Sequence, residues 1–239
     1  MHRYSAHLAT LALALGASSA NAQVKQQGRP NTLTDAEKSA GWQLLFDGQT
    51  TNGWRGYKTQ SVPAAWHVTP NGSLAKDTGT ADLITTDKFA NFDLQLDWKI
   101  APKGNAGIFY RGTEEYDHIY WSGPEYQLLD DAGHVDGKYR ITAAASDYAV
   151  YPSPKGYLHR AGRWNHTRIL VNGNHVEHWL NGHKMVSYEL GSPDWQKRVK
   201  KSKFAMFPNY GKATTGYIGI QGDHDGALEL RNIKIKVLP

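Results

Sequence analysis

Apolar and polar residues alternate along residues 91–100, which carry the clearest structural signal in the chain. Every second position is apolar from Phe92 to Ile100, and the positions between them are Asp, Gln or Lys. A period of two is typical of a β-strand that has one face in a core and the other toward solvent. The pattern therefore predicts a half-buried strand over 91–100.

Shorter apolar segments separated by turn residues predict further strands. Three of them follow one another: 164–171, 175–180 and 184–190. The turns between them, Asn172-Gly173-Asn174 and Asn181-Gly182, predict a three-strand meander. Two closing strands are predicted over 216–221 and 228–237, and a change of apolar parity at Arg231-Asn232 predicts a β-bulge in the last one.

Helical signals are few. One helix is predicted from Ser192-Pro193 onward, because proline favours the first helical turn. No alternation of strands with helices is visible, so a parallel sheet is not expected. The pattern predicts an all-β sandwich or jelly roll of two antiparallel sheets. The irregular stretches 112–124 and 132–163 are expected to wall a groove on one sheet.

The first 22 residues resemble an export signal, and we do not expect them to be part of the fold. A short basic start containing Arg3 precedes an apolar run over 8–15, and Ala20-Asn21-Ala22 fits the A-x-A cleavage pattern. We therefore expect a signal peptide over 1–22 and a periplasmic or secreted protein. Residues 23–40 are expected to be a flexible mature N-terminus ending in a short helix, with Thr34 and Glu37 as a capping box. The domain is expected over 41–239.

Composition narrows the function classes. The chain has no cysteine, which excludes disulfides and thiolate metal sites, and no later segment is apolar enough to span a membrane. The net charge of +5 is mild. We interpret the cluster Lys197-Arg198, Lys200-Lys201 and Lys203 as a solvated helix face, so no nucleic-acid partner is expected. Motifs for serine hydrolases, nucleotide binding and zinc proteases are missing.

The densest candidate chemistry lies on two segments, 104–112 and 123–131. If Tyr126 is a core residue, parity turns Glu125 to the open face of the sheet. Asn105 and Arg111 share one parity in the other segment, so Arg111 and Glu125 are expected to meet in one groove. The alternative is a structural Arg–Glu pair across strands.

A second candidate is the turn Gln221-Gly222-Asp223-His224-Asp225-Gly226. His224 suits a proton carrier, because the ordinary histidine pKa lies near neutrality. It would otherwise only cap backbone groups of the turn. No cofactor is expected. A divalent metal held by Asp223, His224 and Asp225 stays open as an alternative, although the spacing matches no specific metal motif.

These segments, together with several others, resemble the 3-keto-disaccharide hydrolase domain family. The resemblance extends from Gly41 to Leu238 and is carried by many short motifs in order. They are 41–48 (GWQLLFDG), Gly53-Trp54, 66–68 (WHV), 72–74 (GSL), 104–109 (GNAGIF), 125–130 (EYQLLD), 162–165 (GRWN), 178–182 (HWLNG), 219–224 (GIQGDH) and 231–235 (RNIKI). Two departures are Gly222, inserted where the family often has Gln-Asp-His, and Arg163, where Glu is common.

The resemblance implies a concanavalin A-like jelly roll and activity on 3-keto-glycosides, which a separate sugar C3 dehydrogenase would supply. A C3 ketone acidifies the C2 proton, so that a base can remove it and the C1 substituent can leave before water adds. Glu125 and His224 are the expected proton-transfer residues, and Arg111 or Asn105 is expected to stabilise the enolate oxygen.

The remaining expected substrate-binding residues lie on the same segments and the groove walls. They are Gln127, Asp130, Tyr120, Trp121, Tyr148, Tyr151 and Asp223. Two alternatives remain open at this point: a carbohydrate-binding lectin-like domain without catalysis, and a classical glycoside hydrolase, which needs two carboxylates about 5–9.5 Å apart.

Overall fold

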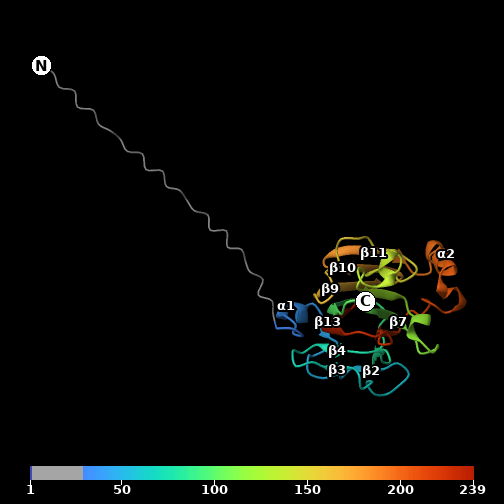
Figure 1. Cartoon of the computed structure of the whole chain (residues 1–239), viewed down its shortest axis with the longest axis horizontal. Coiled ribbons are helices and arrows are strands. Elements are labelled where there is room, and N and C mark those ends of the chain that lie inside the picture. The colour runs from blue at the N-terminus through green and yellow to red at the C-terminus, as the bar shows by residue number, and fades with distance from the viewer. Residues whose placement is uncertain (2–28) are drawn as a thin grey trace.

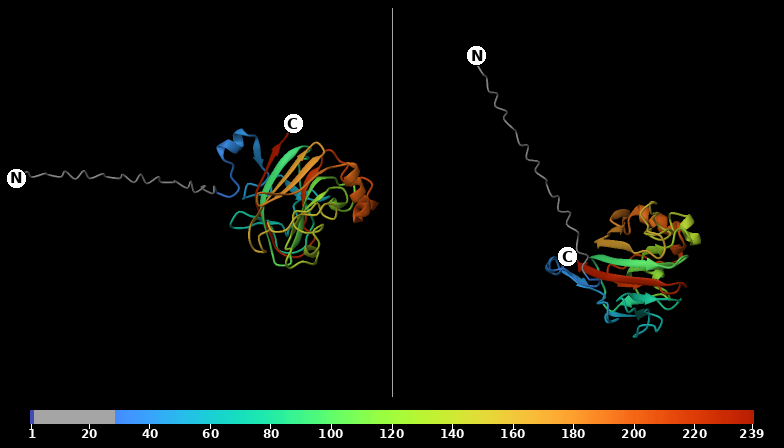
Figure 2. Two further views of the ribbon diagram at one scale, coloured as in Figure 1. Left: turned by 90° about the horizontal axis from the view of Figure 1, so that it is seen from above. Right: turned by 60° about the vertical axis from the view of Figure 1, so that its left-hand side comes forward.

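The structure is a computed structural model that describes Met1 and residues 29–239 (Figure 1). Two antiparallel β-sheets are stacked in layers, and further views show α1 and α2 at opposite ends of the sandwich (Figure 2). The protein is therefore an all-β, concanavalin A-like jelly roll, as the sequence predicts. Apart from Met1, the predicted signal peptide and residues 23–28 lie outside the described residues.

Within the described residues, the larger sheet has eight strands. In spatial order they are β11 (His183–Glu189), β10 (His175–Leu180), β9 (Asn165–Asn172), β6 (Phe92–Ile100), β13 (Leu228–Val237), β4 (Leu74–Lys76) and β3 (His67–Val68), with β1 (Trp42–Leu44) also paired to β13. The five-stranded sheet has the order β2 (Trp54–Gly56), β5 (Leu83–Thr85), β12 (Tyr217–Ile220), β7 (Asn105–Gly112) and β8 (Glu125–Leu129). All the strands predicted by periodicity are present.

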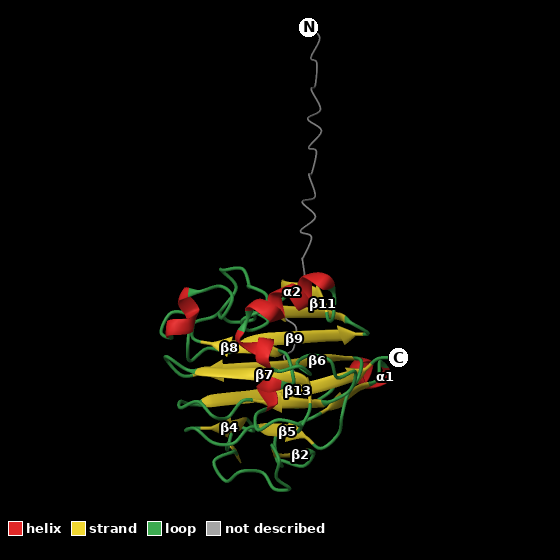
Figure 3. Cartoon of the chain, turned by 90° about the vertical axis from the view of Figure 1, so that its right-hand side faces the viewer, coloured by secondary structure: helices red, strands yellow, loops and turns green. Residues whose placement is uncertain are grey.

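Helices are short and lie outside the sheets (Figure 3). They are α1 (Asp35–Ser39), α2 (Pro193–Lys201) and the 3-10 turns η1 (Ile119–Trp121), η2 (Val135–Lys138) and η3 (Lys203–Met206). The capping box of Thr34 and Glu37 is confirmed at α1. The helix predicted from Ser192 is confirmed as α2, with the Ser192 hydroxyl accepting a hydrogen bond from the backbone N–H of Trp195. Among the described residues, no helix has the length and apolarity needed to cross a membrane.

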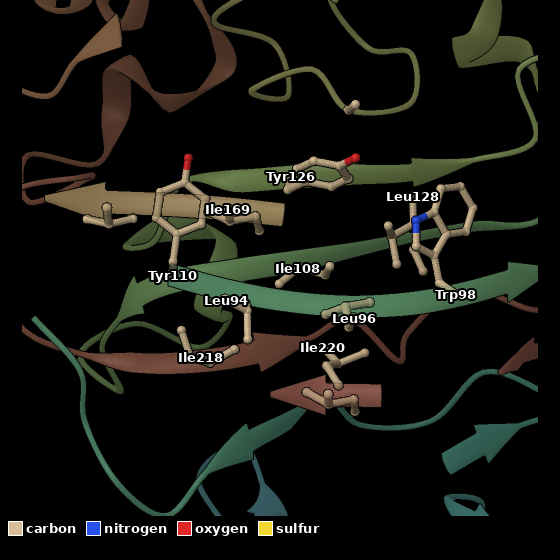
Figure 4. Close-up of a cluster of buried hydrophobic side chains, with 14 of the residues drawn as sticks. Leu94, Leu96, Trp98, Ile108, Tyr110, Tyr126, Leu128, Ile169, Ile218 and Ile220 are labelled. Atoms are coloured by element: carbon tan, nitrogen blue, oxygen red, sulfur yellow. The ribbon is translucent and has the colours of Figure 1, made fainter. Parts of the chain in front are cut away.

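The core lies between the sheets and follows the predicted alternation. Figure 4 shows Trp98 of β6, Ile108 of β7, and Tyr126 and Leu128 of β8 in this layer, all fully buried. Burial of each large apolar side chain contributes about 1.5–3 kcal/mol. The one polar atom of Trp98 is satisfied, because its Nε1–H donates to Thr167 Oγ1 at 2.9 Å. Alternate residues of β7 and β8 consequently face away from the core.

The predicted bulge in the last strand is confirmed. The pairing of β13 with β6 shifts between Arg231 and Lys234, and Asn232 has a φ of 54°. The bulge also receives the N-terminal segment, since the backbone N–H of Asn31 donates to Asn232 Oδ1 at 2.7 Å. Glu37 forms an ion pair with Lys234 of β13. Residues 29–40 are thus fastened to the sheet where the sequence suggests a flexible segment.

Candidate active site

A cavity of about 250 Å³ opens on the face of the five-stranded sheet that points away from the core. Strands β7 and β8 and the residue that follows β12 form its floor, and the loops that carry η1, η2 and η3 form its walls. The lining residues are Asn105, Tyr120, Glu125, Gln127, His134, Asp136, Tyr148, Lys203, Gln221, Asp223 and His224. The structure thus brings together seven of the residues that the sequence predicts, from Asn105 to His224.

The centre of the floor is a glycine between two glutamines. Gly107 pairs with Gln127 on β8, and its carbonyl accepts a hydrogen bond of 2.9 Å from the backbone N–H of Gln221 on the other side. Glu125 lies two pairs further along and opposes Phe109. Because Gly107 has no side chain, the carboxyl group of Glu125 lies over it: an added Cβ would be 2.2 Å from Oε1 of Glu125.

Glu125 is a buried acid without a partner. Its side chain is only 4% exposed, and its carboxyl group accepts no hydrogen bond from the residues that the structure describes. Burial raises the pKa of this carboxyl group to about 8, the nearby Lys203 ammonium opposes the increase, and the carboxyls of Asp223, Asp82 and Asp147 add to it. Most Glu125 carboxyl groups therefore carry a proton at neutral pH.

The floor around Glu125 offers oxygen acceptors. Asn105 Oδ1, Gln127 Oε1 and Gln221 Oε1 are buried and have no hydrogen-bond donor among the described residues. The Gln127 amide is oriented by its Nε2–H, which donates to the carbonyl of Thr142 at 3.3 Å. Buried acceptors without partners are costly, so these amides suit a ligand that brings donors, such as the hydroxyl groups of a sugar.

Lys203 supplies the positive charge of the cavity. The sequence predicts it as part of a solvated helix face, but α2 ends at Lys201 and Lys203 begins η3 instead. Its Nζ lies 4.4 Å from the ring centroid of Tyr148 and 5.7 Å from that of Tyr120. It forms no ion pair with the described residues. This cation beside two aromatic rings was missed because the helix face predicted from the sequence extends past Lys201, where α2 ends.

The turn that carries His224 is held from both ends by buried charged side chains. Asp82 Oδ1 accepts a hydrogen bond of 2.7 Å from the backbone N–H of Gly222. The ammonium of Lys76, which is 1% exposed, donates to the carbonyls of His224 and Gly226 at 2.6 and 3.1 Å. Burial raises the pKa of Asp82 to about 7. These hydrogen bonds therefore hold the backbone of the turn beside the cavity.

The structure explains why glycine occurs at position 222, where the chain departs from the family motif. A Cβ at this position would lie 2.5 Å from the carbonyl oxygen of Ala81 and 2.9 Å from that of Thr80. Only glycine allows the chain to approach residues 80–82 so closely and to donate to Asp82. His224 still reaches the cavity, with its Nε2 3.7 Å from Asp223 Oδ1.

The alternative metal site at this turn finds no support in the geometry. Asp225 points to the neighbouring loop, where its Oδ1 accepts from the backbone N–H of Gly79 at 3.0 Å and from the Thr78 hydroxyl at 3.2 Å. Within the described part of the chain, no three histidine or carboxylate side chains are grouped closely enough to hold a metal ion.

Arg111 lies outside the cavity, which corrects the expected groove of Arg111, Glu125 and His224. Its guanidinium donates to the carbonyls of Ala90 and Gly173 at 2.9 and 2.8 Å. The cause is a bulge: β7 has one more residue than β12 between their paired positions, and Arg111 has a φ of 51°. The extra residue reverses the alternation, so Arg111 no longer shares the face of Asn105.

Three other predicted substrate-binding residues are also placed elsewhere. Asp130 Oδ2 accepts from the backbone N–H of Lys103 at 2.8 Å. Trp121 stacks on Phe207, and Tyr151 stacks on Tyr188 and donates its hydroxyl hydrogen to Asp194. Trp121 ends the 3-10 turn η1 and Tyr151 lies between β8 and β9, and strand parity gives no guide to orientation at either position. The loops instead contribute His134 and Asp136, which the sequence did not single out.

Comparison with known proteins identifies the family of the chain. The sequence profile of the 3-keto-alpha-glucoside-1,2-lyase-like domain matches residues 41–236. A protein of Bacteroides thetaiotaomicron named 3-keto-disaccharide hydrolase is 34% identical over 229 residues, which cover 83% of this chain and 79% of that protein. This chain belongs to the 3-keto-alpha-glucoside-1,2-lyase-like family.

Solved structures resemble most of this chain. A candidate glycosyl hydrolase from Parabacteroides distasonis is 35% identical, with a TM-score of 0.82 and coverage of 88% of this chain and 100% of that one. A second candidate glycosyl hydrolase from the same organism is 27% identical, with a TM-score of 0.66 and coverage of 82% and 99%.

The motifs that carry the family resemblance form the floor of the 250 Å³ cavity. The GNAGIF segment supplies Asn105, the EYQLLD segment supplies Glu125 and Gln127, and the GIQGDH segment supplies Gln221 and His224. A larger cavity of about 660 Å³ lies beside α2 and contains none of these motif residues. The smaller cavity is therefore the candidate active site of this 3-keto-alpha-glucoside-1,2-lyase-like domain.

Proposed function

We propose that this chain is a carbohydrate-active enzyme that cleaves 3-keto-glycosides by elimination followed by hydration. The observation that carries the proposal is the desolvated carboxyl group of Glu125, which has no hydrogen-bond partner among the described residues and lies on a floor of amide oxygens, with the Lys203 ammonium and His224 in the same cavity. The family membership and the name of the Bacteroides relative support a keto-sugar as substrate.

The chemistry requires one base, one acid and one charge stabiliser. A base removes the C2 proton. The electron pair of the broken C2–H bond is delocalised onto the C3 ketone, which becomes an enolate. The enolate collapses to an enone with a C1–C2 double bond, and the C1 oxygen leaves with a proton from the acid. Water then adds its oxygen to C1 and a proton to C2, which yields the 3-keto-sugar.

The cavity offers a group for each role. Glu125 is protonated at neutral pH, so it suits the acid that protonates the leaving oxygen. The backbone of His224 is held at the cavity by Lys76, and we assign to His224 the role of the base that removes the C2 proton. Lys203 takes the place expected for Arg111, because a cation is suited to stabilise the enolate oxygen. Gln127 and Gln221 are suited to bind sugar hydroxyls.

A classical glycoside hydrolase is less well supported by this geometry. It needs two carboxylic groups that flank the glycosidic bond. Besides Glu125, the cavity contains Asp136 and Asp223. Asp136 accepts a hydrogen bond of 3.1 Å from the Tyr148 hydroxyl, and Asp223 belongs to the exposed turn. Neither is a desolvated partner for Glu125.

Hydrolysis in deuterium oxide tests the elimination route. The product of a 3-keto-glucoside should contain deuterium at C2, because the hydration step takes its C2 proton from solvent. The control is the same product incubated without enzyme, which measures spontaneous exchange next to the ketone. A product that keeps its C2 hydrogen at the level of this control would show direct hydrolysis and contradict the mechanism.

We also propose that the protein is exported, from the signal-peptide pattern of residues 1–22. Mass spectrometry of the protein isolated from its native host should find a mature N-terminus at or near Gln23. An uncleaved Met1 in the cytoplasmic fraction would contradict the proposal.

A further inference from the structure

A cavity of about 660 Å³ lies between α2 and the segment 204–214. Its volume is in the range of pockets that hold small molecules. Its charged lining residues are Arg111, Lys200 and Lys212, and it has no acidic lining residue. The cavity therefore presents positive charge without a matching carboxylate.

Arg111 is the principal charge of this cavity. It is only 4% exposed, and all its hydrogen bonds go to neutral oxygens, those of Ala90, Asn91 and Gly173. Its Nη1 donates no hydrogen bond to the described residues, and no described carboxylate pairs with it. A buried charge is costly unless it is paired, so an unpaired guanidinium at a cavity wall favours an anionic ligand.

The remaining wall is aromatic. The Phe204 and Tyr210 rings stack with centroids 4.1 Å apart, and Trp195 lies parallel to Tyr210 at 5.8 Å. All three are buried, and all three line the cavity. A flat ring with an acidic substituent would contact these apolar walls and place its charge toward the guanidinium of Arg111.

We propose that this cavity is a second binding site, for a small organic anion that has a carboxylate or phosphate group on a ring. Arg111 binds the acidic group directly, Lys200 and Lys212 attract it from the rim, and the aromatic wall contacts the ring. The site is separate from the candidate active site, because the two cavities have no lining residue in common. They are neighbours: Lys203 lines the candidate active site, and the next residue, Phe204, lines the second cavity. The proposal does not depend on the proposed function.

Calorimetry with matched probes tests the site on the full chain. Benzoate and phenyl phosphate represent the two acidic groups, benzyl alcohol is the neutral counterpart, and inorganic phosphate lacks the ring. We expect saturable binding of at least one ring-bearing anion, at least tenfold weaker binding of benzyl alcohol and of inorganic phosphate, and weaker binding at high salt. Absence of binding by both ring-bearing anions overturns the proposal, and so does equal binding of the neutral alcohol or of inorganic phosphate.

Variants locate the binding. Arg111→Lys should reduce affinity at least tenfold, because a lysine cannot present the planar fork of a guanidinium. Arg111 also joins three backbone segments, so the double variant Lys200→Met/Lys212→Met provides a test that leaves these contacts intact; it should reduce affinity severalfold. The matched control is Lys197→Met/Lys201→Met, two exposed lysines of α2 that do not line the cavity. An equal loss in the control would show non-specific attraction and overturn the site.

Discussion

A methyl group on Gly107 would lie 2.2 Å from Oε1 of Glu125 and 2.8 Å from its Cδ. The carboxyl group of Glu125 therefore occupies the space that the side chain of any other residue type at position 107 would fill. Strand β7 thus helps to position a side chain of the adjacent strand β8. Because Gly107 has no side chain, the Glu125 carboxyl group can lie over it, above the floor of the cavity.

Gly107→Ala should consequently displace the carboxyl group and reduce kcat/KM for a 3-keto-glucoside at least tenfold. Folding should change less than activity, because the three nearest atoms to the added Cβ all belong to the Glu125 side chain and none to the backbone, and alanine costs a strand no more than glycine does. Kinetics and thermal unfolding measure the two effects. The Glu125→Gln background is the control, in which the same change should have a much smaller effect on the remaining activity. A fully active Gly107→Ala variant would refute the positioning role.

Glu125→Gln should lower turnover of a keto-glycoside about a hundredfold or more, the usual scale for a general acid or base. It should also stabilise the fold above pH 5. The folded-state pKa of Glu125 is raised from 4.5 to about 8, so ionisation costs stability as the pH rises from 4.5 to 8, roughly 3 kcal/mol by pH 7. The amide does not ionise and avoids this cost.

Chemical unfolding at pH 5 and pH 8 measures the difference. The matched control is Asp117→Asn, which removes an exposed carboxylate from the loop before η1 and should change neither activity nor the pH dependence of stability. If Glu125→Gln destabilised the protein at both pH values, Glu125 would have a structural role instead.

The pH profile of kcat/KM identifies the role of Glu125. If its protonated form is the acid, kcat/KM should decline as the pH rises through about 8, because the carboxyl group then loses the proton that it must donate. An activity that instead rises through pH 8 to a plateau would make Glu125 the base and exchange its role with that of His224.

Lys203→Met should reduce kcat about a hundredfold, the scale found when one stabiliser of a developing negative charge is removed. Because the Lys203 ammonium lowers the pKa of Glu125, its loss should also move the alkaline decline of activity to higher pH. The control Lys201→Met removes an exposed charge at the end of α2 and should leave both properties unchanged. A Lys203→Met enzyme with normal kcat and an unmoved pH profile would contradict the assignment.

The part of the site that lies in regular strands could be predicted from the sequence. Strict alternation turns Tyr126 to the core, and Glu125 and Gln127 then have to face the other way. Arg111 shows the limit of this argument, since the extra residue in β7 reverses parity without any apolar signal.

The loop residues could not be predicted in this way. His134, Asp136 and Lys203 reach the cavity because loops fold over the sheet, and no local period encodes that arrangement. One signal was available for Lys203: serine is a frequent cap residue, and the Ser202 hydroxyl accepts a hydrogen bond from the backbone N–H of Phe204, the second residue of η3. A new turn at Ser202 removes Lys203 from the helix face.

The most direct test of the account compares a 3-keto-glucoside with the same glucoside before oxidation, each incubated with the purified protein and with its Glu125→Gln variant. We predict release of the aglycone from the keto-glucoside only, and at least a hundredfold slower release by the variant. Cleavage of both sugars would indicate a classical glycoside hydrolase, and binding of the keto-glucoside without cleavage would indicate a lectin. Either result would contradict the proposed elimination chemistry.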